Sequence, residues 1–322
     1  VHENKDMDGG SMEITDKINY VLGKTVVYML LIIYPFVMHN KLNDVTLTRF
    51  FFFIIVSYVG FLVLCINSLA SFILKRVSDK KKYDDDNVDF INIQEGAYSA
   101  ESQSISKVYD IKDKIKNMDL WKKLIFLFLF VCIMSYLFSP YKSVAFLGHG
   151  GRYTGLVFYG ACVCMYYVVS TCYRFEKRDI TYVLCSTILV NVWAVLNYAG
   201  MDPFYIYKDV PAAMKTVYIS SLGNIDIYGM YVNMMLALAM FSFVYEESTA
   251  GKLFYGICAL LGMMGSLASD SDMAVAGMFF AFVILIYFAI SDYNRLIRYF
   301  MLAVELFIAG RILGVIYIFN QF

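Results

Sequence analysis

Residues 139–156, SPYKSVAFLGHGGRYTGL, place four glycines beside a histidine and an arginine. Glycine lets the backbone approach a ligand closely, and Arg152 could present its planar guanidinium to a phosphate. His149 lies nearby and is a second candidate for the same ligand. A tight glycine turn followed by an arginine that reaches for the membrane surface also explains the segment. The segment therefore predicts an anion-binding site, with a plain turn as the alternative.

Residues 217–231, VYISSLGNIDIYGMY, have the composition of a turn followed by a helix start. Free N–H groups at a helix N-terminus favour anions, so Asn224 is a candidate binding residue. Asp226 would complement the dipole of the same helix. Ordinary capping by Asn224 is the favoured alternative. The preceding loop, about 200–219, carries Asp202, Lys208, Asp209 and Lys215 among several tyrosines, a weak sign of sugar or peptide binding.

Two further places carry charge close to apolar blocks. Asp270 and Asp272 alternate with serines in the short segment SLASDSDMAVAG, residues 266–277. They could bind a sugar hydroxyl, pair with Arg152, or cap the next helix. Carboxylates this near a membrane are costly unless they are paired or hydrated.

Glu305 and Arg311 lie inside the last apolar block, where an ionisable residue suggests a functional site. Arg311 lies about 12 Å from the outer end of that block, so it could reach the same outer cavity as Arg152. Pairing with another helix is the alternative. Glu305 and Arg311 are six residues apart, which disfavours a direct pair because that offset puts them on different faces.

The elements that position these residues follow from the apolar blocks. The chain has 322 residues, of which 60% are hydrophobic, and the apolar residues gather in blocks that can cross a hydrocarbon core of about 30 Å. Backbone groups in lipid must be satisfied internally, so each block is expected to be a helix. We predict an all-α, polytopic integral membrane protein with about nine transmembrane helices. The expected spans are roughly 19–39, 50–74, 121–138, 154–173, 180–199, 227–245, 252–268, 273–291 and 297–319.

Lysine and arginine determine the orientation of such a protein. They are dense after the second block and before the third, and sparse in the alternate loops. This pattern predicts a cytoplasmic N-terminus. It divides the chain into a polar tail (1–18), two helices (19–77), a polar cytoplasmic linker that is disordered or loosely helical (78–118), and the remaining helices with their outer loops (119–322). The candidate residues then lie on or near the outer face.

Other classes of function are disfavoured by composition. The formal net charge is zero, so no nucleic-acid partner is expected. The seven cysteines fall within or at the ends of apolar blocks, and the three histidines form no metal-binding motif. We expect neither a metal nor a cofactor.

Three of these segments resemble the O-antigen ligase and O-antigen polymerase superfamily of bacterial membrane glycosyltransferases. They are G-x-G-G-R-x-x-G at Gly148–Gly155, S-L-G-N at Ser221–Asn224, and S-D-S-D at Ser269–Asp272. The family usually continues the second segment with Pro-Asn, where Ile225 and Asp226 stand here. It usually has Ser-Arg-Gly in the third, where Asp272 stands at the place of the arginine.

The resemblance implies a multi-pass protein of the bacterial cytoplasmic (inner) membrane that transfers or polymerises glycan at the outer leaflet. The donor would be an oligosaccharide on an undecaprenyl-pyrophosphate carrier, and the acceptor a glycan or a lipid. Outer-face arginines would grip the pyrophosphate. A histidine in a late external loop would be the general base, expected here beyond Phe322, so that the chain would not be active alone. A transporter or flippase for an envelope precursor, and a non-catalytic membrane scaffold, are the alternatives.

Overall fold

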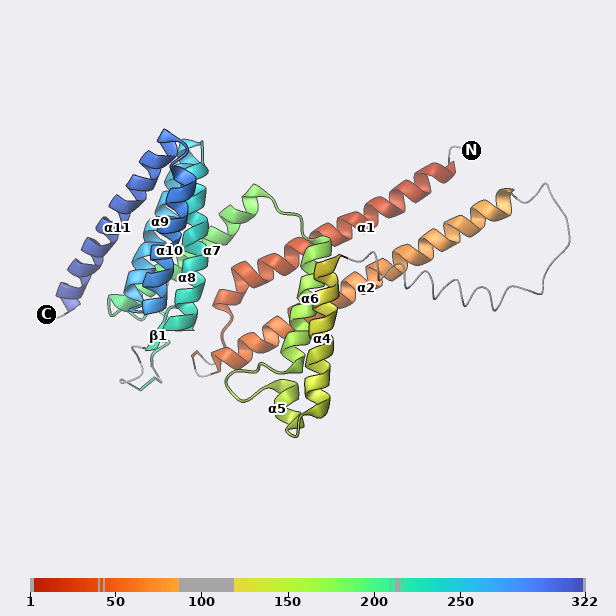
Figure 1. Ribbon diagram of the computed structural model, residues 1–322, viewed down its shortest axis with the longest axis horizontal. Coiled ribbons are helices and arrows are strands. Elements are labelled where there is room, and N and C mark those ends of the chain that lie inside the picture. Colours follow the sequence, from red (N-terminus) through yellow and green to blue (C-terminus); the bar gives the residue numbers. More distant parts are fainter. Residues whose placement is uncertain are drawn as a thin grey trace. The chain divides into compact units, whose positions relative to one another are not determined.

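The computed structural model describes residues 3–39, 41–42, 44–86, 119–208, 210–211, 215 and 217–320. Almost all of the regular structure is helical (Figure 1), and the described part includes eight helices long and apolar enough to cross a membrane. The chain divides into two compact units. Unit 1 comprises residues 1–27 and 53–174, and unit 2 comprises residues 28–52 and 175–322.

Unit 1 contains most of α1 (Glu3–Tyr28), most of α2 (Val45–Asp86), α4 (Leu120–Phe138), the short α5 (Lys142–Leu147) and α6 (Leu156–Cys172). Polar side chains join the first two helices. The Asn67 amide donates to the Asn19 side-chain oxygen at 2.8 Å, and the hydroxyls of Thr15 and Ser71 are 3.0 Å apart. Helices α4, α5 and α6 pack on one another. Side-chain hydrogen bonds thus supply part of the association that hydrophobicity alone cannot drive in lipid.

Unit 2 is a helix bundle built around α9 (Thr249–Ala268), which packs against α7 (Lys177–Tyr198), α8 (Ile225–Tyr245) and α11 (Tyr293–Asn320). Helix α10 (Asp272–Ala289) packs mainly on α8. Between α7 and α8, β1 (Tyr218–Ile219) pairs antiparallel with β2 (Gly223–Asn224). We call the two ends of this bundle the Tyr198 end and the Lys177 end, after the last and first residues of α7.

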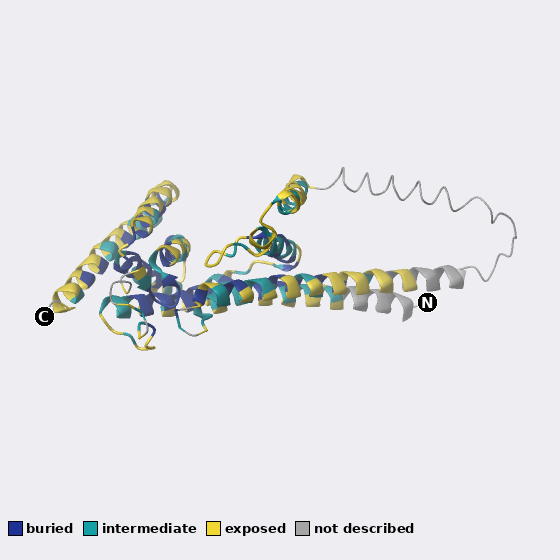
Figure 2. Ribbon diagram, turned by 90° about the horizontal axis from the view of Figure 1, so that it is seen from below, coloured by how far each residue is buried: buried dark blue, intermediate teal, exposed yellow. Residues whose placement is uncertain are grey.

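The core of unit 2 is built from buried residues of α7, α8 and α9, to which α10 and α11 add others. Buried residues are drawn dark blue in Figure 2. Gly265 of α9 permits this close packing, since a Cβ atom there would lie 2.0 Å from the Tyr228 hydroxyl. That hydroxyl donates to the Asn191 side-chain oxygen at 2.9 Å. A close approach of three helices around one glycine is typical of membrane interfaces, where small residues let backbones come near.

The prediction of an all-α membrane protein is confirmed in its coarse form, and all nine predicted blocks are helical. The fourth block gives a helix of 17 residues, Leu156–Cys172, which is shorter than the eight spanning candidates. The first block ends earlier than expected: a π-helix (Met29–Ile33) and a 3-10 helix (Tyr34–Phe36) close it around Pro35. Proline lacks the N–H that would continue the ladder.

The second helix is longer than predicted. We expected it to end near residue 74 and a polar linker to begin at 78, but α2 runs from Val45 to Asp86. A polar composition does not end a helix, and residues 61–95 contain no glycine or proline to do so. Residues 87–118 of the predicted linker lie outside the described residues.

Candidate functional site

A cavity of about 680 Å³ opens at the Tyr198 end of unit 2. Its walls come from the end of α7 and the loop after it, from β1, from the first residue of α8, from the end of α9 and from α11. The lining is amphipathic, with tyrosine rings beside charged and amide groups. The side chains of chemical interest are Asn197, Tyr198, Asp202, Tyr207, Lys208, Lys215, Tyr218, Asp270 and Tyr317.

The loop wall of this cavity is built around Asp202. Its carboxylate accepts hydrogen bonds from the backbone N–H groups of Ile206 and Tyr207, both at 2.9 Å. The Tyr207 hydroxyl donates to the carbonyl of Tyr218 at 2.7 Å, which ties the loop to β1. Burial, and secondarily the negative charge of Asp202, raises the pKa of Tyr207, so its hydroxyl stays a neutral donor. Asp202 therefore holds the wall in shape, and both oxygens of its carboxylate already accept backbone hydrogen bonds.

Lys208, Lys215 and Asp270 are the other charged groups of the cavity, and all three are exposed. In the described part of the chain, none of the three side chains has a hydrogen-bond or ion-pair partner. Asp270 has φ +51°, a left-handed conformation that aspartate adopts more readily than most residues with a Cβ atom. The cavity thus offers two cations and one carboxylate to a ligand.

Arg49 anchors the turn between β1, which lines the cavity, and β2. Arg49 is only 5% exposed. Its hydrogen bonds with the described residues all go to carbonyl oxygens, and its guanidinium carbon lies 5.8 Å from the centre of the Tyr34 ring. Nη1 donates to Leu222 at 2.8 Å, Nη2 donates to Ser221 at 2.5 Å and to Pro35 at 3.1 Å, and Nε donates to Val37 at 3.2 Å. One guanidinium therefore fastens the Ser221–Leu222 turn to the chain that precedes α2.

Asn224 is the N-cap of α8, as the capping alternative predicts. Its side-chain oxygen accepts from the N–H groups of Asp226 at 2.8 Å and Ile227 at 3.4 Å. Asp226 stands in the first turn and accepts from the Ser271 hydroxyl at 3.3 Å. Asn224 does not line the cavity, so its part in substrate binding stays a prediction.

Asp272 and Arg311 also stand apart from the cavity. Asp272 is the first residue of α10, where Ser271 is the N-cap residue without a side-chain capping bond. Arg311 is exposed on α11, whereas Tyr317 of the same helix lines the cavity. Glu305 of α11 is partly buried, and its Oε2 atom has no hydrogen-bond partner among the described residues.

The remaining candidates, His149 and Arg152, belong to unit 1. Gly148 (φ +92°) and Gly155 bring the two ends of their loop together, since a Cβ atom at Gly155 would lie 2.4 Å from the Phe146 carbonyl oxygen. The motif therefore folds as a tight turn. Arg152 is exposed on it, and its side chain has no partner within the described residues. Nothing lies within 4 Å of a Cβ atom at Gly150, so space is open beside the arginine.

An apolar groove of about 510 Å³ begins beside this turn, within unit 1. Phe146 of α5 and Leu156 of α6, which flank the turn, both line it. The rest of its wall comes from α2, α4 and α6, with Tyr58, Phe126 and Tyr167 as its aromatic residues. The dimensions and chemistry of this groove suit a hydrocarbon chain.

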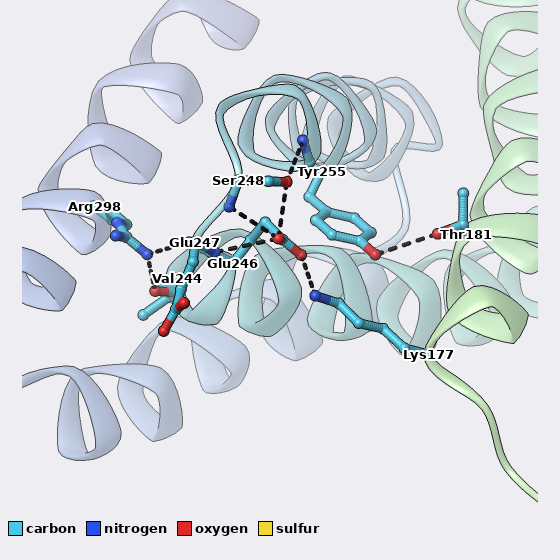
Figure 3. Close-up of polar contacts among 9 residues, drawn as sticks. Lys177, Thr181, Val244, Glu246, Glu247, Ser248, Tyr255 and Arg298 are labelled. Carbon is cyan, nitrogen blue, oxygen red and sulfur yellow. Dashed lines mark hydrogen bonds and ion pairs between the residues drawn. The ribbon is translucent and has the colours of Figure 1, made fainter.

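The Lys177 end of unit 2 holds a structural cluster instead (Figure 3). Glu246, 6% exposed, follows α8, pairs with Lys177 at 2.8 Å and accepts from the Ser248 hydroxyl at 3.0 Å. The hydrogen bond from Lys177 is the main reason that the pKa of Glu246 is lowered to about 2. Arg298 of α11 donates to the carbonyls of Val244 at 2.8 Å and Glu246 at 2.6 Å. The cluster joins α7, α8, α9 and α11 and leaves the Glu246 carboxylate fully engaged.

Fold and site together define an all-α, multi-pass membrane protein with an amphipathic cavity at one end of its larger bundle. Comparison of the chain with protein-family models, with curated proteins and with solved structures finds no match.

Sequence reasoning missed two parts of this site. It did not single out Arg49, which stands immediately before the second apolar block and could have been noticed as an arginine at the membrane edge. It also missed Asn197, whose side-chain oxygen accepts from the Ser220 N–H at 2.8 Å and which lines the cavity. Asp209 of the predicted sugar-binding loop lies outside the described residues.

Proposed function

We propose that this protein binds a glycan on a lipid-pyrophosphate carrier at the outer leaflet and transfers or polymerises it. The observation that carries the proposal is the cavity at the Tyr198 end, with its tyrosines, Asn197, Asp270, Lys208 and Lys215. Aromatic rings pack against the apolar faces of sugars, while carboxylate and amide groups bind their hydroxyls. Lysines bind phosphate or other anionic groups as point charges. With a cytoplasmic N-terminus, the proposed topology of about nine spans puts this cavity outside.

The turn of unit 1 supports the same function by itself. Arg152 is exposed and free to bind an anion, and the apolar groove next to its turn suits the hydrocarbon part of a lipid. A fixed cation stabilises the charge that develops as a pyrophosphate leaves. We therefore propose that Arg152 binds the carrier's pyrophosphate, with His149 as a neighbouring hydrogen-bonding group.

Transfer chemistry also needs a base for the acceptor hydroxyl. None of the cavity's described residues is a histidine. Asp270 is the exposed carboxylate in the cavity, and we assign it to sugar binding. We assign no general base among the described residues of the cavity.

The test is transfer of a radiolabelled lipid-pyrophosphate-linked glycan by the protein that the complete gene encodes. Lys208→Gln combined with Lys215→Gln, and separately Arg152→Ala, should each lower the transfer rate by about tenfold or more. Lys252→Gln, which changes a lysine at the other end of α9, should leave it unchanged. Normal transfer by both the double lysine variant and Arg152→Ala would refute the proposed site.

A transporter is the second candidate, and Glu305 is the observation that favours it. A carboxylate oxygen without a partner inside a spanning helix is costly, and such groups often carry protons or ions in transporters. Substrate uptake into proteoliposomes that Glu305→Gln abolishes would support this candidate over glycan transfer.

A further inference from the structure

Helix α11 presents a charge to its surroundings on the side away from the bundle. Its buried residues, Leu302, Ala309 and Leu313, pack on the other helices, and Arg311 lies on nearly the opposite side of the helix. The Arg311 side chain has no hydrogen bond or ion pair with any part of the chain that the structure describes. It stands in a helix apolar enough to span a membrane, where an unpaired cation is expensive.

The Arg311 side chain starts toward the middle of α11 rather than toward its nearer end. In a helix each Cα–Cβ bond tilts toward the N-terminus, which for α11 is the Lys177 end of the bundle. The nearer end of α11 is its C-terminus, nine residues further on at Asn320. The side chain therefore leaves the backbone in the direction of the membrane interior. A partner with a negative charge would remove this cost.

An opposite charge is exposed on the neighbouring helix at a matching position. Asp272 is the first residue of α10, is exposed, and makes no capping bond or ion pair among the described residues. Helices α10 and α11 are joined by the short turn 290–292. Measured from that turn along each helix, Asp272 lies about 26 Å away and Arg311 about 27 Å away, at about 1.5 Å per residue. The two charges are therefore at nearly equal distances from the turn, yet they do not pair within one chain.

The surface around these two charges is apolar and suited to a helix. Phe279 and Val283 of α10 are 63% and 48% exposed, and Val304 of α11 is 58% exposed. Beside Arg311, nothing lies within 4 Å of a Cβ atom at Gly310 or Gly314. Glycines four residues apart let a second helix come close. The face thus combines a close-approach surface with one acid and one base.

We propose that a second copy of this chain docks on the α10–α11 face. A two-fold axis along the membrane normal would bring Arg311 of each copy to Asp272 of the other. In a two-fold interface every contact between two residues occurs twice, once in each direction. Both charges are then neutralised at the same depth. Because each chain carries both the acid and the base, the partner that docks on this face is a second copy of the same chain.

The experiment measures association of the full chain, fused to donor or acceptor fluorescent proteins, by energy transfer in liposomes at several protein-to-lipid ratios. The wild-type chain should form dimers. Arg311→Asp and Asp272→Arg should each weaken dimerisation by about tenfold or more, since each puts like charges together twice. The combined Asp272→Arg/Arg311→Asp chain should recover it to within about threefold, because the swapped pair restores opposite charges.

Gly314→Leu tests the same face without changing charge, and it should also weaken dimerisation. Lys252→Asp, a charge reversal away from the face, should have no effect, and the melting temperature of each variant should stay within a few degrees of the wild type. A monomeric wild-type chain would overturn the proposal. So would a double variant as weak as the single ones, or an anionic lipid that co-purifies with a monomer and is lost in Arg311→Asp.

Discussion

Replacing Arg49 by methionine tests whether one buried guanidinium maintains the turn at the cavity. Methionine keeps much of the length of the side chain but donates no hydrogen bond. The carbonyls of Pro35, Ser221 and Leu222 would then lose a donor in a buried setting. Each lost partner costs about 1 to 3 kcal/mol, and relief of the buried charge offsets part of the sum. We expect a net loss of about 3 to 5 kcal/mol.

For a protein of this size, such a loss corresponds to about 6 to 10 °C in the melting temperature, at about 2 °C per kcal/mol. A thiol-reactive fluorophore can follow unfolding of unit 2 through Cys258, which is buried in α9, in a chain whose other cysteines are changed to serine. The melting temperature of Arg49→Lys should lie between those of the wild type and Arg49→Met, because one ammonium group cannot reach all four carbonyl oxygens that the guanidinium reaches.

Arg152→Met is the matched control, since Arg152 is exposed and unpaired within the described residues, and its melting temperature should not move. The reasoning fails if Arg49→Met melts within about 2 °C of the wild type. It also fails if Arg49→Met melts at a lower temperature but still binds a lipid-linked glycan as the wild type does, since the cavity would then not depend on the anchored turn.

Four other substitutions should separate positions on which the fold depends from one on which it does not. Glu246→Gln should lower the free energy of unfolding at neutral pH by about 2 kcal/mol through loss of charge-assisted hydrogen bonds, as read from the melting temperature. Because the pKa of Glu246 is lowered from 4.5 to about 2, the stabilisation by its carboxylate is complete above about pH 4.5 and fades as the pH falls toward 2. If the wild type and Glu246→Gln lost stability equally over that range, this reasoning would be contradicted. Gly265→Ala should lower the melting temperature by several degrees, because its methyl group would meet the Tyr228 hydroxyl, and unchanged melting would show that the helices can separate there without cost. Gly155→Ala should destabilise unit 1, whereas Gly150→Ala should not. Protease resistance of the folded chain distinguishes the two variants, and equal resistance would refute the close approach at Gly155.

The helices were predictable because lipid leaves few alternatives. An apolar block of spanning length must satisfy its own backbone, so composition alone places it in a helix. The start of α8 was also predictable, because Asn224 is a typical cap and acts within three residues of itself. Local rules of this kind do not determine where a helix ends in polar sequence. The end of α2 at Asp86 was therefore not predicted.

The cavity could be predicted only in part. Its loop residues Lys208 and Lys215 stood out by composition, but the wall that faces them comes from residues far along the chain, such as Asp270 and Tyr317. A single sequence contains no direct record of that convergence. Arg152 and Asn224 stood out by residue type and lie in the short motifs that carry the family resemblance, yet Asn224 is engaged in capping α8.

Four arginines show why residue type alone does not identify a binding site. Arg49 donates to four carbonyl oxygens and Arg298 to two, so both guanidiniums are engaged in holding backbone. Arg152 and Arg311 have no such partners within the described residues. In sequence all four stand at or inside apolar blocks and look alike. What separates them is whether the fold already satisfies their donors, because only an unsatisfied cation gains enough from an anion to bind it. The same criterion leaves Arg152 and Arg311 available for the ligand and the second chain that we propose for them, and it makes Arg49 the anchor of the turn that follows β1.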